Sequence, residues 1–333
     1  MESPFTGGKV ELLTEEKQIE FRKDQFTINQ LYYKCVDTAE EFSTDEIDQV
    51  NLNQLYNRYR VKYGLPFPEE IKQIREQYGL SASKMSEILG LGTNSYRQYE
   101  AGDISTVANG RLILAAKDPK ELLKFLDASK SLLSEKDYLK FKKTASQLIE
   151  ERKNNYWNYM YHEHVFKYIT PCDFNGYRTP NELKVANMIS YFSKSSLNLF
   201  KTKLNKLLFY SDFLNYKRTG YSISGIAYRA IQMGPVPAEY DKLYIKLVDD
   251  NLVNLEYVQF TSGYGEALKG EAFSPELFTE KELESMKDVL MKFGKKSTID
   301  MVKLSHLEPG WIENEGSHEV ISYPEYAFRL TQI

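Results

Sequence analysis

The sequence IKQIREQYGLSASKMSEILGLGTNSYRQYEAG occupies residues 71–102 and predicts three short helices in a helix-turn-helix arrangement. In the first helix, apolar side chains recur three and four residues apart, which places them on one face. These residues are Ile71, Ile74 and Tyr78. Lys72 and Arg75 are expected to face outward.

Serine and glycine residues mark the two helices that follow. Ser81 or Ser83 can cap the second helix, and Gly90 ends it. Gly92 and Thr93 are expected to form the next turn and to cap a third helix over residues 94–101.

The third helix has polar side chains on its outer face. We expect the following residues to contact DNA: Thr93, Asn94, Ser95, Arg97 and Gln98. Short hydrogen-bonding side chains near a helix N-terminus suit base edges in a major groove. The alternative is an ordinary three-helix hairpin with solvated polar residues. Glu100 is interpreted as a residue that ties the loops together, because phosphates would repel a carboxylate.

Composition indicates a globular protein of two or three domains. The 333 residues are 42% hydrophobic and 27% charged, and no apolar run approaches the ~20 residues that span a bilayer. Residues 1–10 have no apolar signal core, and Cys35 and Cys172 cannot form a disulfide framework. We therefore expect a cytoplasmic protein that does not contact membranes.

The charge distribution is uneven along the chain. Residues 1–56 contain five Lys/Arg and twelve Asp/Glu, whereas residues 57–117 contain nine Lys/Arg and six Asp/Glu. The local positive balance falls on the helix-turn-helix, where phosphate contacts require it. Because the excess is modest, we expect a homodimer to bind DNA through two copies.

Residues 1–56 predict a small β unit. The expected strands are Lys9–Leu13, Gln18–Arg22 and Phe26–Cys35. The segments SPFTGG at 3–8 and YKCVDTAEEF at 33–42 resemble the zinc ribbon of MqsA/YgiT-type antitoxins. The four zinc-ligand positions of that family read Ser3, Thr6, Cys35 and Thr38 in this chain. One cysteine cannot hold structural zinc, so the resemblance implies a ribbon without metal.

The same resemblance extends over residues 3–126. It is carried by KYGL at 62–65, by Glu70-Ile71 and Ile74-Arg75, and by Tyr99-Glu100-x-Gly102. It implies an Xre-like helix-turn-helix domain over 57–128, with Asn94 and Gln98 at the base-reading positions.

Residues 129–180 are expected to connect two domains. Leu132–Arg152 predicts a helix that either dimerises or simply packs, and residues 151–180 read as aromatic and irregular. His162 and His164 would share one side of a strand, which permits a metal site, but a structural or interface role is preferred.

Residues 181–333 predict an α+β domain. The expected helices are Glu182–Lys194, Lys201–Tyr216, Ala238–Leu247, Thr279–Phe293 and Ser297–Ser305. Ile226–Ile231 reads as a strand, and Leu255–Phe260 with Leu268–Ala272 reads as a hairpin. Thr279 and Glu282 have capping-box spacing.

Four ordered motifs in this region resemble the Panacea, or SocA-like, antitoxin domain. They are KLLFYSDF at 206–213, TGYSISG at 219–225, AIQMGPVPAEYDKLY at 230–244 and STIDMVKLSHLEPGW at 297–311. The resemblance implies that this domain binds and neutralises a toxin. The aromatic segments 156–180 and 208–244 could form the interface. The residues selected for toxin contact are Arg218, Tyr228, Arg229, Met233, Pro235, His306 and Trp311.

The sequence has no motif that predicts an enzyme. It has no phosphate-binding glycine loop and no Gly-x-Ser-x-Gly nucleophile elbow. Ser305, His306 and Glu308 are too close along the chain to be expected in triad geometry. We expect neither a catalytic residue, nor a cofactor, nor a metal.

These observations predict a mainly α protein with small β elements, an α+β fold. Its expected domains are 1–56, 57–128, 129–180 and 181–333. The favoured function is that of a type II antitoxin which neutralises its toxin and represses its own operon. The alternative is a transcription regulator or proteolytic adaptor whose C-terminal domain binds another ligand or partner.

Overall fold

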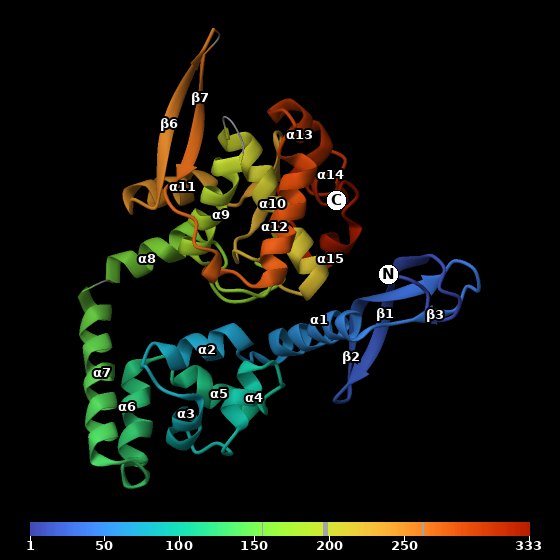
Figure 1. Ribbon diagram of the computed structural model, residues 1–333. Coiled ribbons are helices and arrows are strands. Elements are labelled where there is room, and N and C mark those ends of the chain that lie inside the picture. Colours follow the sequence, from blue (N-terminus) through green and yellow to red (C-terminus); the bar gives the residue numbers. More distant parts are fainter. Residues whose placement is uncertain (155, 196–198, 262) are drawn as a thin grey trace. The chain divides into compact units, whose positions relative to one another are not determined.

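The chain forms two compact units (Figure 1). The computed structural model describes residues 1–154, 156–195, 199–261 and 263–333. Unit 1 combines Met1–Leu55 with Val165–Ile333, and unit 2 is Tyr56–His164. Helices and small antiparallel sheets make up the described residues, in agreement with the predicted mainly α fold class. The boundaries between the four expected domains stay predictions.

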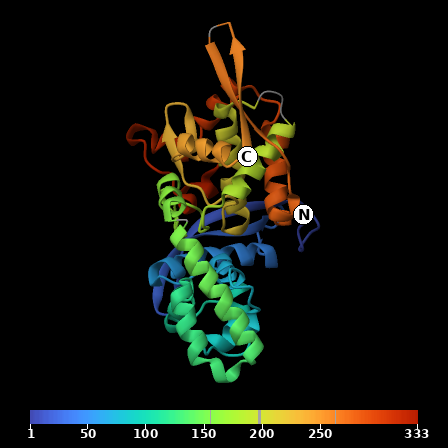
Figure 2. The same cartoon turned by 90° about the vertical axis from the view of Figure 1, so that its left-hand side faces the viewer.

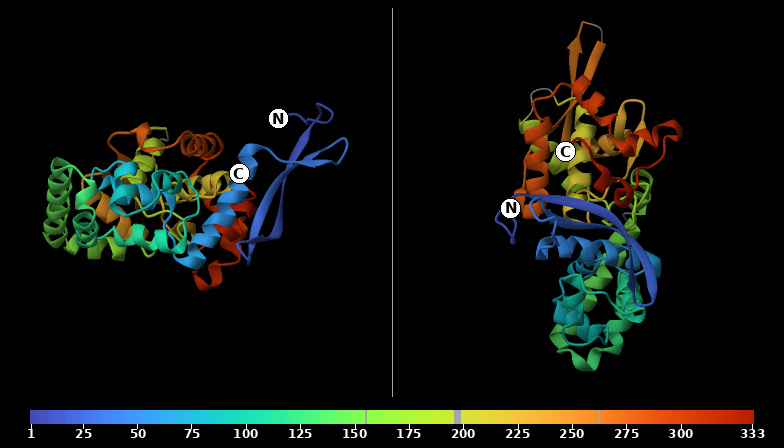
Figure 3. Two further views of the ribbon diagram at one scale, coloured as in Figure 1. Left: turned by 90° about the horizontal axis from the view of Figure 1, so that it is seen from below. Right: turned by 90° about the vertical axis from the view of Figure 1, so that its right-hand side faces the viewer.

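Unit 1 begins with a long β-hairpin. Its strands are β1 (Val10–Phe21), β2 (Asp24–Cys35) and β3 (Glu41–Phe42), and β2 lies in the middle (Figure 3). Arg22 and Lys23 have φ angles of 50° and 73° and make the two-residue turn. The two short strands predicted over residues 9–22 are therefore one continuous strand, because β2 pairs with its whole length.

Side-chain amides of α1 (Asp45–Tyr63) fix this helix to β2. Asn51 accepts a hydrogen bond from the Leu31 N–H and donates one to the Leu31 carbonyl, both at 2.9 Å. Gln54 makes the same pair of bonds with the backbone of Asn29, at 3.0 and 2.8 Å. The amides thus act like a neighbouring strand and satisfy backbone groups of β2.

Unit 2 is helical, and its core includes the three helices predicted over 71–102. Its elements are α2 (Pro68–Glu76), α3 (Ala82–Ile88), α4 (Ser95–Glu100), α5 (Val107–Ala115), α6 (Pro119–Ala128), η1 (Lys130–Leu132), α7 (Glu135–Asn154) and α8 (Tyr156–Val165). Ser81, not Ser83, caps α3 by accepting a hydrogen bond from the Lys84 N–H. α7 lies beside α6 and adds Tyr138, Phe141 and Ala145 to the core (Figure 2).

The region between α7 and α9 is more ordered than its sequence predicted. His162 and His164 lie on α8, so the strand predicted for them is wrong. The segment that follows α8 packs into unit 1: Asn175 is buried and bonds to the carbonyls of Tyr168 and Thr170. The side chains of residues 156–159, part of the aromatic segment 156–180 considered for toxin contact, lie outside the described residues.

The C-terminal part of unit 1 surrounds one helix, α10. Its elements are α9 (Glu182–Ser195), α10 (Lys201–Thr219), β4 (Tyr228–Ile231), β5 (Gly234–Pro237), α11 (Tyr240–Asp249), β6 (Val253–Phe260), β7 (Gly263–Gly270), η2 (Pro275–Leu277), α12 (Glu280–Phe293), α13 (Thr298–Ser305), α14 (Pro309–Ile312), η3 (Glu315–Ser317), α15 (Tyr323–Tyr326) and η4 (Ala327–Arg329). Residues 234–237 of the Gly-Pro-Val motif form β5, because they pair with β4.

α10 is buried all round, not only on the broad apolar face that its sequence predicted. Every residue from 203 to 216 is buried, and α9, α12, α13, β5 and β7 contact the helix. The interior therefore also receives polar groups of α10, and these require partners.

The Asp212 carboxylate is the polar group of α10 that receives four hydrogen bonds in the interior. One carboxylate oxygen accepts hydrogen bonds from the backbone N–H groups of Ile223 and Ser224, at 2.7 and 2.8 Å. The other accepts the hydroxyls of Ser224 and Tyr228, at 2.6 and 2.7 Å. Burial raises the pKa of Asp212, and these hydrogen bonds act in the opposite direction. The carboxylate thereby holds the chain from α10 to β4 in one conformation.

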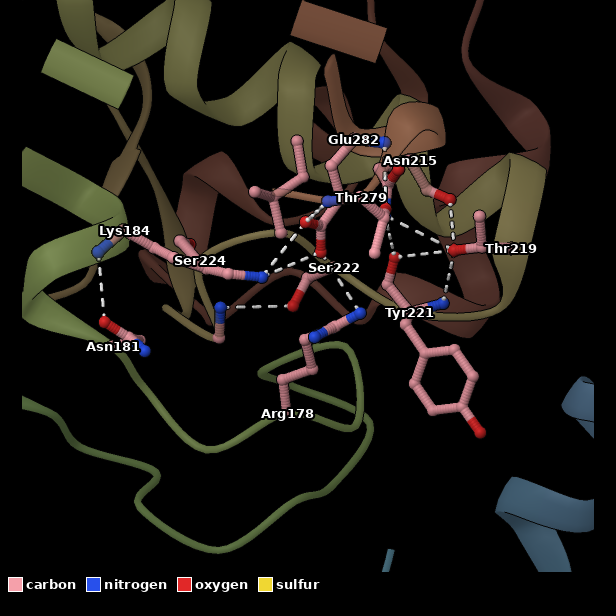
Figure 4. A network of polar contacts seen from close by, with 12 residues as sticks. Arg178, Asn181, Lys184, Asn215, Thr219, Tyr221, Ser222, Ser224, Thr279 and Glu282 are labelled. Carbon is pink, nitrogen blue, oxygen red and sulfur yellow. Dashed lines mark hydrogen bonds and ion pairs between the residues drawn. The ribbon is translucent and has the colours of Figure 1, made fainter. Parts of the chain in front are cut away.

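A second buried carboxylate, Glu282, joins three segments (Figure 4). It completes the predicted capping box by accepting the Thr279 N–H at 2.9 Å. Its oxygens also meet the Lys184 ammonium of α9 at 2.9 Å and the Arg178 guanidinium at 3.1 Å. A helix cap predicted from local spacing is thus also the centre of a tertiary ion-pair network.

We predict that Asp212→Ala weakens unit 1 selectively. The change would leave four donors without their acceptor, so the expected loss is about 3 kcal/mol or more. In thermal unfolding of the full chain, the transition of unit 1 should fall by about 6–12 °C. The exposed Glu284 is the control, and Glu284→Ala should leave both transitions in place. An unchanged Asp212→Ala transition would contradict the role given to this carboxylate.

Candidate functional site

The residues predicted to contact DNA gather at the start of α4. Thr93, Asn94, Arg97 and Gln98 are exposed, and Ser95 is half-buried. Asn94, not Thr93, occupies the cap position of α4, and its side chain makes no capping hydrogen bond. The Asn94 amide therefore faces solvent with its hydrogen-bonding groups available.

α4 is held on α2 and α3 by buried polar contacts. Tyr96 is fully buried and donates its hydroxyl to the Ile71 carbonyl at 2.8 Å. Arg75, predicted to face outward, instead lies inward with 17% of its side chain exposed, and it contacts Glu100 at 2.6 Å. It also donates to the Leu80 carbonyl at 2.8 Å. Glu100 thus ties α4 to α2 through Arg75, which in turn bonds to the loop at Leu80, in line with its interpretation from sequence.

Most residues selected for toxin contact have partners inside unit 1. Tyr228 is buried against Asp212, and Pro235 is buried on β5. The His306 and Trp311 rings stack with centroids 3.8 Å apart, and the Trp311 indole N–H donates to the Ile231 carbonyl at 2.7 Å. Tyr228 is buried on β4 and Pro235 is buried on β5, so neither side chain can contact a partner protein without rearrangement.

The remaining selected residues lie nearer the surface. Arg218 pairs with Asp288 at 2.5 Å, and Arg229 pairs with Glu239 at 2.9 Å. Met233 lies between β4 and β5 and is 49% exposed. The aromatic residues of segment 208–216 are buried in α10, so they cannot supply an interface as the sequence suggested.

Ser305, His306 and Glu308 do not form a chain of hydrogen bonds. The Ser305 hydroxyl donates to the Val302 carbonyl at 2.9 Å. Glu308 accepts the backbone N–H groups of Thr331 and Gln332, at 2.9 and 3.1 Å. Burial lowers the pKa of His306, so its imidazole is neutral at pH 7. The three side chains are occupied in separate structural contacts.

Lys206 is an unusual buried group that the apolar pattern of α10 concealed. It is fully buried, and its ammonium donates to the Pro235 carbonyl at 3.1 Å. Burial lowers its pKa to about 7. Lys206 lines a recess of about 240 Å³ beside Met233. Gly234 closes this region: its φ is 93°, and a Cβ there would lie 2.3 Å from the Ser305 hydroxyl and 2.7 Å from Lys206 Cε.

A groove of about 350 Å³ lies next to this recess, between α11 and the β6–β7 hairpin. We call it the α11 groove. It shares Lys201, Asp241 and Glu266 with the recess. The Lys201 ammonium contacts Glu266 at 2.5 Å and Asp241 at 3.4 Å, which forms a polar boundary between the two hollows. Sequence reasoning missed this site, because a hairpin prediction does not show which helix lies against it.

Ser3, Thr6, Cys35 and Thr38, the four positions compared with zinc ligands in the sequence, come together in the fold. The Thr6 hydroxyl oxygen lies 3.6 Å from the Cys35 sulfur. Hydrogen bonds from Ser3, and then from Thr38, lower the pKa of Cys35 to about 6. Among the described residues, no group of three or more His, Cys, Asp or Glu side chains could hold a metal ion. The same part of the chain has no helix that is long and apolar enough to cross a membrane.

The region built around α10, with its small sheets and C-terminal helices, is similar to an antitoxin-like domain. Residues 204–312 match the family model described as "Antitoxin SocA-like, Panacea domain". This match covers about a third of the chain, and it supports the resemblance of the C-terminal motifs. It relates the C-terminal domain to toxin–antitoxin systems. No curated protein and no solved structure matches the chain. The resemblance of residues 3–126 to MqsA/YgiT antitoxins stays a prediction.

We predict that replacing Lys206 changes the pH dependence of stability. The pKa of Lys206 is about 7 in the fold and 10.5 for an unburied lysine, so between these two pH values the unfolded chain binds one more proton than the folded chain. Lys206 therefore opposes folding below pH 7, and this cost disappears as the pH rises towards 10.5. Relative to the parent, Lys206→Met should be more stable at pH 6.5 than at pH 10, by a few kcal/mol.

Urea unfolding at several pH values measures this difference. Lys292→Met, on the exposed face of α12, is the control and should change stability by less than about 0.5 kcal/mol throughout. A Lys206→Met difference that does not vary with pH would show that Lys206 stays charged in the fold.

Proposed function

We propose that this protein is the antitoxin of a type II toxin–antitoxin system. The match of residues 204–312 to the SocA-like Panacea family carries the proposal. In this proposal the C-terminal domain binds the cognate toxin and covers its working surface. The helix-turn-helix binds operator DNA and represses the shared promoter. The protein works in the cytoplasm as a homodimer, and it needs no catalytic activity or cofactor.

The surface of the C-terminal domain supports a role in protein binding. Neutralisation by direct contact needs an interface of standard size with aromatic or apolar side chains near its centre. Ile245, Tyr257, Phe260 and Tyr264 are all exposed on α11 and the β6–β7 hairpin. This hairpin extends away from the helices of unit 1 (Figures 1 and 3).

The α4 face supports the proposed role in DNA binding. Asn94 and Gln98 are exposed and have amides that can bond to base edges, and Arg97 beside them can meet a phosphate. The Arg75–Glu100 contact and the buried Tyr96 hold this face rigidly on the core of unit 2. A single motif of this kind reads a short half-site, which is why the proposal includes a dimer.

A regulator or proteolytic adaptor without a toxin is the alternative. The Lys206 recess favours it, because a recess with a buried cation could hold a small ligand. A toxin-like reading frame directly beside this gene distinguishes the two functions.

We predict that the full chain restores growth when it is expressed with the toxin encoded beside it. A chain that lacks residues 181–333 should not restore growth, because it lacks the neutralising domain. Binding of the shortened chain to operator DNA is the control that shows unit 2 has folded. Rescue by the shortened chain would rule out neutralisation by the C-terminal domain.

We predict that the full chain binds a palindrome in its own promoter, with an affinity that falls steeply as salt rises. Asn94→Ala combined with Gln98→Ala should lower specific binding at least about tenfold, because base contacts are lost. Gln147→Ala, an exposed glutamine of α7, is the matched control. Mobility-shift titrations with promoter and scrambled DNA measure both. Unchanged sequence preference in the double variant would remove these residues as base readers.

A further inference from the structure

The α11 groove has two walls of defined construction. One wall is a single face of α11, which presents positions 241, 244, 245, 248 and 249 at helical spacing. The other is one face of the β6–β7 hairpin, where Leu255 pairs with Leu268 and Tyr257 pairs with Glu266. Since alternate residues of a strand share a face, the hairpin offers the groove a row of side chains.

The interior of the groove is apolar and open to solvent. Ile245 from α11 is 57% exposed, and Tyr257 from β6 is 64% exposed. Leu268 is fully buried beneath them. Tyr257 is further supported by Tyr264, in an edge contact with ring centroids 5.6 Å apart. Adjacent large apolar side chains on a surface mark a place where another molecule binds.

The rim of the groove is acidic. Among the described residues that line it, the carboxylates are Asp241, Asp249 and Glu266, and the one cation is Lys201. Lys201 already contacts Asp241 and Glu266, and its one positive charge leaves the three carboxylates with an excess of negative charge. The groove therefore attracts a cationic segment, and long-range attraction of this kind also sets the rate of encounter.

The construction of the walls indicates the conformation of the occupant. The backbone groups of β6 and β7 lie in the plane of the hairpin, so they do not point into the groove. An added strand would find no hydrogen bonds there, whereas a helix can lay an apolar stripe between side chains. A helix with cations on either side of that stripe also meets the acidic rim.

We propose that the α11 groove binds a basic amphipathic helix of the toxin. Its apolar stripe packs between α11 and the hairpin, and its lysine or arginine side chains lie against the three carboxylates. The identity of the partner rests on the proposed function, whereas the chemistry of the occupant rests on the groove itself.

Two synthetic helices of about 14 residues test this chemistry without the toxin. One has leucine at every third or fourth position and lysine elsewhere, and the other has glutamate in place of lysine. Fluorescence anisotropy with the full chain should show at least tenfold tighter binding of the lysine peptide. Equal affinity for the two peptides would overturn the proposal, and so would binding of neither.

Three variants of the full chain locate the binding. Ile245→Glu and Asp249→Lys should each weaken the lysine peptide at least fivefold, and Asp249→Lys should strengthen the glutamate peptide. Ile299→Glu is the matched control, since Ile299 is also an exposed helical isoleucine of unit 1, at 68%. Both groove residues are exposed, so thermal unfolding should show that each variant folds. Parent-like affinity of Ile245→Glu would place the peptide elsewhere.

Growth with the toxin encoded beside this gene connects the groove to neutralisation. The parent and Ile299→Glu should restore growth, and Ile245→Glu should not. If the parent fails, the proposed function is wrong, and the peptide measurements still decide the groove. If the parent and Ile245→Glu restore growth equally, the proposed function stands and the groove is not the toxin site.

Discussion

The structure of the C-terminal domain depends on satisfying one buried carboxylate. Asp212 lies on a helix with no solvent face, so its charge must be met by donors that the fold brings to it. Those donors are two backbone N–H groups and the hydroxyls of Ser224 and Tyr228. Their positions set the path of residues 222–228, and this path leads directly into β4. The Asp212 contacts therefore fix where β4 begins, and Ile231, Met233 and Val236 of the following β4–β5 hairpin line the Lys206 recess.

The buried carboxylates have more hydrogen-bond and ion-pair partners in this interior than the buried Lys206 has. Asp212 receives four hydrogen bonds, and Glu282 receives the Lys184 and Arg178 cations together with a backbone N–H. Lys206 has one carbonyl as its partner, and no carboxylate pairs with it among the described residues. A saturated anion stabilises one conformation, whereas a cation with spare donors leaves binding capacity in the core. Asp212 and Glu282 thus hold the shape of the domain, whereas Lys206 lies beside a cavity.

Local signals in the sequence were sufficient for most helices and for several of their ends. Thr279 and Glu282 form the predicted capping box, and Ser81, one of the two candidates, caps α3. Such caps can be predicted because they depend on residues three positions apart. Contacts distant in sequence were not predictable in this way. Arg75 turns inward because Glu100 comes to meet it, and Tyr228 is buried because Asp212 requires its hydroxyl. The α11 groove was missed for the same reason, since the sequence predicts α11 and the hairpin separately and each of them forms only one wall of the groove. The DNA and toxin contacts themselves stay predictions.

The order of the two units along the chain has a consequence for synthesis. Unit 1 is divided in sequence, with Met1–Leu55 at one end and Val165–Ile333 at the other, and unit 2 lies between them. A ribosome therefore releases a complete unit 2 before the second part of unit 1 has been made. Until then the N-terminal segment lacks two of its partners: Asn53 of α1 donates to the Thr219 carbonyl, and Asn29 of β2 donates to the Pro324 carbonyl. A nascent chain that stops early keeps this hairpin without its partners, open to proteases. Because unit 1 is divided in this way, it becomes stable only when the whole chain has been made.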